Sequence, residues 1–306
     1  MSIMNNLNFA ATCGFALMLG TAVTLSSCTE EVMNPEDQTV YAPVSVQVRE
    51  FSVSMEGFPS TRAAEAPSDY SEVKSLTLVF YDSNGTKFSE TTQLKGDAST
   101  YTTFGQFSFS LSVGNYTLVA IGRNWFENDV FVLTSPTAAA YTSDFPRETF
   151  CATQSVSITN GHPLDLSITL NRINTKLAIN STDLRPSGTA KLRTTYTAAS
   201  KGFNPTTGLA TDANGFSVEN TLTGNVGKKA VVGNTAFLSS DQQTMDITLE
   251  VLDGDGHVVC TKVVPNVPLR RNRITVLEGP LFTPSSASTA SFLVETSWLE
   301  GNVVTF

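Results

Sequence analysis

The chain has 306 residues, 15% of them charged, and its formal net charge at pH 7 is −9. This length allows two domains of ordinary size. The sequence lacks any polybasic run that could neutralise phosphates, which argues against nucleic-acid binding.

The N-terminal stretch predicts a lipoprotein signal peptide over residues 1–27. No charged residue lies between Phe9 and Leu25, and the run ends in Leu25-Ser26-Ser27-Cys28. A hydrophobic segment followed by small residues and a cysteine is typical of a chain that is cut and acylated at that cysteine, here Cys28. The run is rich in Thr and Gly and short for spanning a ~30 Å hydrocarbon core. Residues 1–8 lack the usual Lys or Arg.

Residues 28–43 are expected to form a polar tether, with no periodicity. Beyond them the chain shows repeated two-residue alternation of apolar and polar side chains, which is typical of half-buried strands. The clearest runs are 44–48, 76–80, 107–113, 116–120, 164–170, 245–251 and 292–298. Three Asx-rich segments that end in Gly predict turns at 82–85, 212–215 and 253–256. Residues 137–144 alone suggest a short helix.

A new alternation begins after Asn171-Arg172-Ile173-Asn174. We therefore expect an all-β fold with an N-terminal domain at 44–172 and a C-terminal domain at 173–306. Cys151 and Cys260 can pair outside the cytoplasm, or remain buried as small hydrophobic side chains.

No catalytic constellation is recognisable. His162 and His257 lie outside any zinc-ligand spacing, and the sequence has neither a nucleophile elbow nor a phosphate-binding loop. Asp253 and Asp255 resemble the opening of a calcium loop, but the Glu required at its twelfth position is missing, so a hairpin turn is favoured. We expect no enzyme activity, no metal and no cofactor, and infer binding or assembly instead.

Landmarks along the chain resemble the fimbrillin family of the Bacteroides group, the FimA-type subunits of type V pili. An acidic pair, Glu30-Glu31, follows Cys28, as in exported surface lipoproteins of that group, although it is also consistent with a plain tether. The further landmarks are Ser60-Thr61-Arg62-Ala63, the segment 73–82 with its Asn-Gly turn, 111–122, 170–177, 271–279, and a last strand that ends at Trp298.

The resemblance implies two transthyretin-like β-sandwich domains in tandem and assembly by strand exchange. A trypsin-like protease would cut after an arginine in the loop that follows the first strand. Arg62 is the candidate, and Arg49 is weaker because it lies inside the strand. Loss of the strand with Val44, Val46 and Val48 would open a groove. The C-terminal stretch 291–306 of a neighbouring subunit would fill it, with Phe292, Val294 and Trp298 as candidate donor side chains.

Two alternatives to strand exchange stay open. Arg62 can be an uncut loop residue, as in an anchor or tip subunit, and Trp298 with the last strand can belong to its own domain.

The predicted function is a structural or adhesive fimbrial subunit. It would be lipid-anchored at the surface of the outer membrane as a precursor, then lie in the fimbrium, with other fimbrial subunits and possible surface ligands as partners. The alternatives are an uncleaved pilus anchor or a monomeric surface lipoprotein that binds glycan, with Trp125 as its aromatic contact. Trp125 can equally pack against the sandwich edge.

Overall fold

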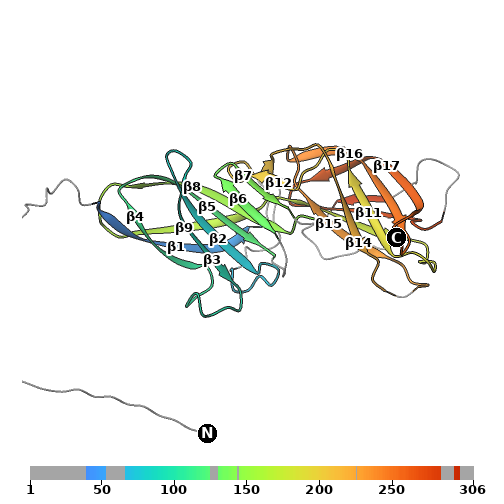
Figure 1. Ribbon diagram of the computed structural model, residues 1–306, viewed down its shortest axis with the longest axis horizontal. Helices are drawn as coiled ribbons and strands as arrows, with labels where there is room; N and C mark the ends of the chain where they lie inside the picture. Colours follow the sequence, from blue (N-terminus) through green and yellow to red (C-terminus); the bar gives the residue numbers. More distant parts are fainter. Residues whose placement is uncertain are drawn as a thin grey trace, which may run out of the picture. The chain divides into compact units, whose positions relative to one another are not determined.

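We describe the protein from a computed structural model, in residues 39–52, 66–124, 130–142, 145–224, 226–283 and 293–296, the last range by backbone alone. The regular structure of these residues consists entirely of β-strands, arranged in several sheets that form two β regions (Figure 1). This confirms the predicted all-β fold class. Among the same residues, no helix is long and apolar enough to cross a membrane.

The first β region is built on a seven-stranded sheet with the strand order β3-β2-β5-β8-β9-β1-β4. Its strands are β1 (Tyr41–Ser52), β2 (Ser75–Asp82), β3 (Lys87–Leu94), β4 (Gln106–Ser112), β5 (Gly114–Arg123), β8 (Thr149–Ile158) and β9 (Leu164–Arg172). One face of the sheet encloses a single hydrophobic cluster. Alternating side chains reach it from all these strands except β3, which explains why the runs at 44–48, 76–80 and 107–111 are so regular.

A smaller sheet covers the opposite face of β2, β5 and β8. It has the order β13-β12-β7-β6 and consists of β6 (Phe131–Ser135), β7 (Ala138–Tyr141), β12 (Gly202–Asn204) and β13 (Leu209–Ala210). The helix expected at 137–144 was wrong, since β7 occupies four of those eight residues. Ala139 and Tyr141 pack into the cluster between the two sheets, and this tertiary contact overrides the helical preference of the alanines.

The second β region is a sandwich of two four-stranded sheets around one hydrophobic cluster. One sheet has the order β15-β10-β18-β19, with β15 (Val231–Ala236), β10 (Thr175–Ser181), β18 (Ile274–Gly279) and β19 (Leu293–Thr296). The other has the order β14-β11-β16-β17, with β14 (Phe216–Thr221), β11 (Lys191–Tyr196), β16 (Gln242–Leu252) and β17 (Val258–Arg270).

The division of the chain after residue 172 stays a prediction. The smaller sheet combines β6 and β7 from before this point with β12 and β13 from after it, so backbone hydrogen bonds cross the proposed boundary. Cys151 and Cys260 are both buried and free. Burial raises the pKa of the Cys151 thiol, which makes it an unreactive core residue.

The predicted turns have the expected backbone conformation. Gly85, Gly215 and Gly256 have φ values of 76°, 83° and 88°. At the first turn the Asp82 carboxylate accepts hydrogen bonds from the N–H groups of Asn84 and Thr86, at 2.9 and 2.8 Å. Asx residues therefore organise the hairpin as the sequence indicated.

Candidate functional site

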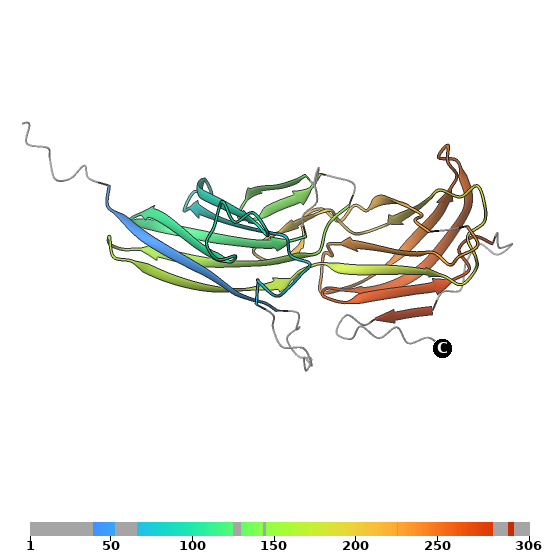
Figure 2. The ribbon, with the colours of Figure 1, turned by 90° about the horizontal axis from the view of Figure 1, so that it is seen from below.

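Strand β1 lies inside the first sheet rather than at its edge. It pairs parallel with β9 from Val44 to Ser52 and antiparallel with β4 from Tyr41 to Gln47. Figure 2 shows β1, in blue, running between these two strands. The strand begins three residues before the predicted start at Val44. Pro43 is tolerated because it precedes the pairing with β9, so only β4 lies beside it.

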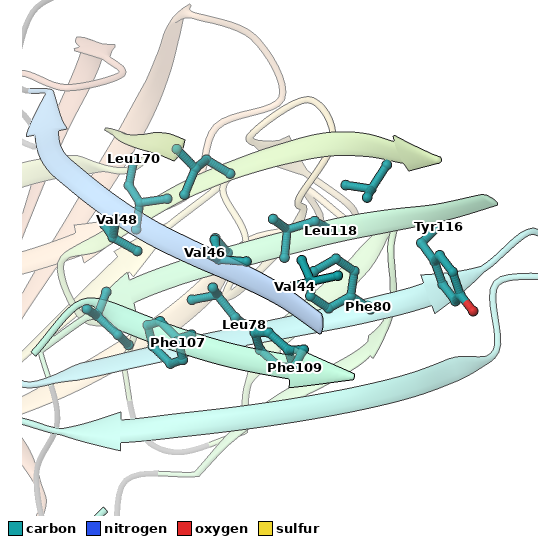
Figure 3. Close-up of a cluster of buried hydrophobic side chains, with 14 of the residues drawn as sticks. Val44, Val46, Val48, Leu78, Phe80, Phe107, Phe109, Tyr116, Leu118 and Leu170 are labelled. Carbon is teal, nitrogen blue, oxygen red and sulfur yellow. The ribbon is translucent and has the colours of Figure 1, made fainter. Parts of the chain in front are cut away.

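The inward side of β1 is part of the core. Ala42, Val44, Val46 and Val48 are at most 2% exposed, whereas the residues between them point outward and are exposed. Figure 3 shows the three valines directed toward Leu78, Phe80 and Leu118 of the facing strands. Each buried valine contributes roughly 1.5–3 kcal/mol to stability. Removing β1 would therefore open a two-sided slot with an apolar floor.

A bulge changes which residues of β1 point inward. The register against β9 shifts between Val48 and Glu50, so Arg49 is the extra residue and is exposed. After a bulge the alternation resumes on the other parity. Phe51 consequently points into the core and is 0% exposed, although simple alternation from Val48 would have placed it outside.

Phe51 fills a pocket between two aromatic rings. Its ring centroid lies 5.6 Å from that of Tyr70 and 4.9 Å from that of Phe150, with the rings tilted or edge-on. Gly122 forms another wall, where an added Cβ would lie 2.9 Å from the Phe51 ring. Glycine at this position in β5 therefore makes room for the aromatic side chain. We call this space the Phe51 pocket, lined by Leu76, Gly122, Phe150, Leu170 and Tyr70.

A buried polar cluster holds Tyr70 in place. The Tyr70 hydroxyl donates to Glu148 at 2.7 Å and accepts from Nη2 of Arg172 at 2.6 Å. Arg172 also donates through Nη1 to the side chain of Asn272 at 2.9 Å, and its guanidinium lies 4.9 Å from the centre of the Phe150 ring. Burial, together with the nearby carboxylate, raises the pKa of Tyr70 despite the opposing effect of Arg172. The cluster thus links the Phe51 pocket to the second β region.

The two sequence landmarks around residues 172 and 272 meet at this cluster. Besides the contact between Arg172 and Asn272, the backbone N–H of Asn272 donates to the carbonyl of Asn174 at 2.9 Å. Asn272 adopts a φ of 56°, a conformation that asparagine tolerates better than most residues. The contact therefore depends on the residue type at both landmarks.

The slot left by β1 would have β9 and β4 as its two walls. The wall formed by β4 is fixed by contacts with β3 as well as with β1. Among the described strands β4 forms a ladder with β1 alone. The buried side chain of Gln93 on β3, however, donates to the Gln106 carbonyl at 2.6 Å and accepts from the Gly105 N–H at 2.8 Å. This amide bridge ties the start of β4 to β3 independently of β1.

Lys95 holds residues 67–70 through three hydrogen bonds. Its ammonium group donates to the carbonyls of Pro67, Ser68 and Tyr70 at 3.2, 2.8 and 3.0 Å. Burial lowers the pKa of Lys95, with Lys74 adding to the effect. Residues 67–70 are therefore fixed to Lys95, which directly follows β3.

Among the described strands, the C-terminal strand β19 lies at a sheet edge and pairs antiparallel with β18 alone. Residues 281–283, which precede it, are anchored by Asp183, whose carboxylate accepts from the N–H groups of Leu281, Phe282 and Thr283 at 2.7–2.8 Å. The buried Lys262 donates to the Thr283 carbonyl at 2.6 Å. Partial burial raises the pKa of Asp183, but the hydrogen bonds from residues 281–283 outweigh it and lower the pKa overall.

Several predicted site residues lie outside the described ranges, namely Cys28, Arg62, Trp125, Phe292 and Trp298. Their roles stay predictions. Val294 belongs to β19, where its backbone pairs with that of Leu277. Arg49 is the bulge residue of β1, and Val44, Val46 and Val48 lie together on the inner side of that strand.

In the described part of the chain, one group of side chains comes within metal-ligand distance, formed by Asp253, Asp255 and His257. Asp253 Oδ1 already accepts from the N–H groups of the other two residues, at 2.9 and 2.8 Å. These contacts are those of an Asx turn, so the group is explained by the β16–β17 hairpin.

Sequence reasoning missed Phe51, Gly122 and the cluster around Arg172. The alternating run ends at Val48, and extending it would put Phe51 on the outer side, because a bulge leaves no clear mark in a single sequence. Gly122 had a weak signal, since a glycine inside an apolar strand run indicates the close approach of another group.

Comparison with known proteins gives one match to a family and several to solved structures. Residues 42–295 match the model described as Family of unknown function (DUF6562). No curated protein matches the chain in sequence.

The solved structures resemble the chain at low identity. A Bacteroides ovatus protein proposed to be an adhesin is 10% identical with a TM-score of 0.49, covering 85% of this chain and 97% of that one. A Bacteroides thetaiotaomicron protein proposed to bind polysaccharide is 12% identical with a TM-score of 0.49, covering 83% and 95%. The fimbrial anchor protein Mfa2 from Porphyromonas gingivalis is 13% identical with a TM-score of 0.48, covering 84% and 98%. Likeness at this level assigns no function.

Proposed function

The chain belongs to the DUF6562 family. We propose that it is a fimbrial subunit, exported as a lipoprotein and assembled by exchange of its first strand. The observation that carries the proposal is the position of β1. β1 is an N-terminal strand inside its sheet, and the sequence that follows it contains the candidate protease site at Arg62. Such a strand can be cut from the chain and replaced by another strand, and we call it a plug.

The sequence supplies the two ends of this plug. Cys28 would carry the lipid that holds the precursor at the outer membrane. A cut after Arg62 would separate the lipid and β1 from everything that follows, beginning at Ala63. The clamp on residues 67–70 through Lys95 would then keep the new N-terminal segment next to the slot.

The proposed partner is the strand of another fimbrial subunit. A slot with unpaired backbone groups on both walls and an apolar floor is filled best by an extended chain, which is β-augmentation. The proposal needs neither a catalytic group nor a cofactor, and it places the assembled protein on the cell surface.

Limited digestion with an arginine-specific protease tests the proposal. We expect a new N-terminus at Ala63 and, on prolonged incubation, oligomers that resist mild detergent. The variant Arg62→Gln should stay intact and monomeric. The matched variant Arg49→Gln should behave as the unsubstituted protein, because Arg49 lies in a paired strand where proteases rarely act.

The competing functions give different results. If the protein is cut after Arg62 yet stays monomeric, and no polymer is found on cells, the stalk function is wrong. If the surface protein keeps its lipid at Cys28, an uncut anchor or a free lipoprotein is favoured. Polysaccharide retention that falls in Trp125→Ala would support the glycan-binding alternative.

A further inference from the structure

The Phe51 pocket differs from the rest of the slot in what it demands of an occupant. Along most of the slot, the apolar floor is contacted by Val44, Val46 and Val48 of β1. These are branched aliphatic side chains, and each is almost fully buried. The Phe51 pocket instead lies between the rings of Tyr70 and Phe150 and against a backbone without a Cβ at Gly122. Such a space is filled well only by a flat, bulky side chain.

All the walls of this pocket remain after a cut at Arg62. Each lining residue lies beyond residue 65, and Tyr70 is fixed by Glu148 and Arg172. An incoming strand therefore meets a preformed pocket rather than a collapsed one. Leaving it empty would create a cavity, which is costly in a packed core.

The bulge in β1 sets the spacing that an occupant must match. Val44 and Val48 are four residues apart, and Phe51 follows Val48 by three because Arg49 is the bulge residue. The sequence after β19 repeats this spacing, with Leu299, Val303 and Phe306. Ser297 stands where β1 has Ala42 and Gly301 where it has Val46, so three of the five core positions carry an apolar side chain.

We propose that the Phe51 pocket sets the register of strand exchange, and that Phe306 of a second copy of this chain enters it, with Leu299 and Val303 at the positions of Val44 and Val48. The inference rests on the proposed function. This register differs from one that uses Phe292, Val294 and Trp298 as donor side chains. It places the aromatic side chain at the end of the slot that Phe51 occupies.

Peptide exchange tests this register. The probe protein carries a specific protease site in place of residues 57–63, so that nicking does not depend on Arg62. Fluorescent peptides of residues 297–306, with and without Phe306→Ala or Val304→Ala, are incubated with the nicked protein, and the bound fraction is measured. A peptide of residues 41–52 is the positive control, and a peptide of residues 291–300 represents the competing register.

We expect the 297–306 peptide to bind and Phe306→Ala to weaken it at least about 100-fold, as for emptying a buried aromatic site. The matched control Val304→Ala occupies the position of the exposed Arg49 and should change binding less than about threefold. Against a Gly122→Ala protein, the added Cβ should weaken the peptide with Phe306 and leave the Phe306→Ala peptide nearly unchanged. Should that variant not fold, the peptide series on the unsubstituted protein decides alone.

The outcomes separate the register from the function. If only the 291–300 peptide binds, or if Phe306→Ala binds as well as its parent, the register is wrong while strand exchange stands. If neither tail peptide nor the 41–52 peptide ever binds, both are wrong. If Phe306-dependent binding occurs but surface protein is never cut, the register stands and the proposed function fails.

Discussion

The two terminal strands of this protein are held in opposite ways. β1 is twelve residues long, pairs with β9 and β4, and buries every inward side chain. β19 is four residues long and pairs with β18 at the edge of its sheet. An interior strand cannot leave without opening the core, whereas an edge strand loses one ladder only.

This difference assigns different roles to the two ends. The anchors of residues 281–283 through Asp183 and Lys262 fix the point from which β19 departs, so its release need not disturb the second β region. Release of β1 requires a break in the chain and a replacement strand. Under the proposed function, β1 would close the slot until the chain is cut, and the C-terminal stretch would leave its sheet to pair with another subunit.

The largest expected difference is between a chain truncated at its N-terminal end and a chain truncated at its C-terminal end. A chain that begins at Ala63 loses three buried valines and Phe51, worth roughly 6–12 kcal/mol together, which is comparable to the whole stability of a domain. We expect it to aggregate or to bind a hydrophobic dye strongly. A chain that ends at Thr283 should stay monomeric and cooperative in thermal unfolding. If the two truncations are equally harmless, the contrast between the strands is wrong.

Next in size is the substitution Phe51→Ala in the uncut protein. It should lower the free energy of unfolding by about 3–5 kcal/mol, because the pocket is left as a cavity. The control Phe88→Ala removes the same side chain from β3, where it is 42% exposed, and should lower it by about 1 kcal/mol or less. Chemical denaturation measures both. Equal losses would show that Phe51 is not a core anchor.

The buried cluster should be more sensitive than a surface ion pair. In Arg172→Met the carboxylate of Glu148 keeps its burial and loses its cation, so we expect a loss of about 3 kcal/mol. The exposed cross-strand pair of Arg193 with Glu219, at 2.7 Å, provides the control, since Arg193→Met should lose less than about 1 kcal/mol. Similar losses for both variants would contradict the role of the cluster.

The smallest effect concerns the hydrogen bonds of Asp183 to residues 281–283, which precede β19, and it depends on pH. The folded pKa of Asp183 is lowered, so its contribution is present above the unfolded value of about 3.9 and is lost as the pH falls through the folded value. At pH 7 Asp183→Asn should be less stable by about 1 kcal/mol, and the difference should shrink below about pH 4. The control variant Asp165→Asn, at an exposed position, should be as stable as the unsubstituted protein both at pH 7 and below pH 4.

Much of the fold could be predicted from sequence and the details of the site could not. The runs at 44–48, 107–113 and 164–170 were regular enough to give their strands, because one face of each meets a core. The pairing of β1 joins it to residues 59–71 positions away in β4 and 119–120 positions away in β9, and no local pattern specifies it. The bulge at Arg49 and the polar cluster of Tyr70, Glu148 and Arg172 depend on the same distant contacts.

The central claim is that β1 is a plug removed by a cut after Arg62, and the mature N-terminus of the surface protein tests it most directly. Surface fibres are sheared from cells that express the chain, and the N-terminus of this protein is identified by mass spectrometry in the fibres and in the membrane fraction. Our account predicts Ala63 in the fibres and acylated Cys28 in the uncut precursor. Fibres in which the protein still begins at acylated Cys28 would contradict it.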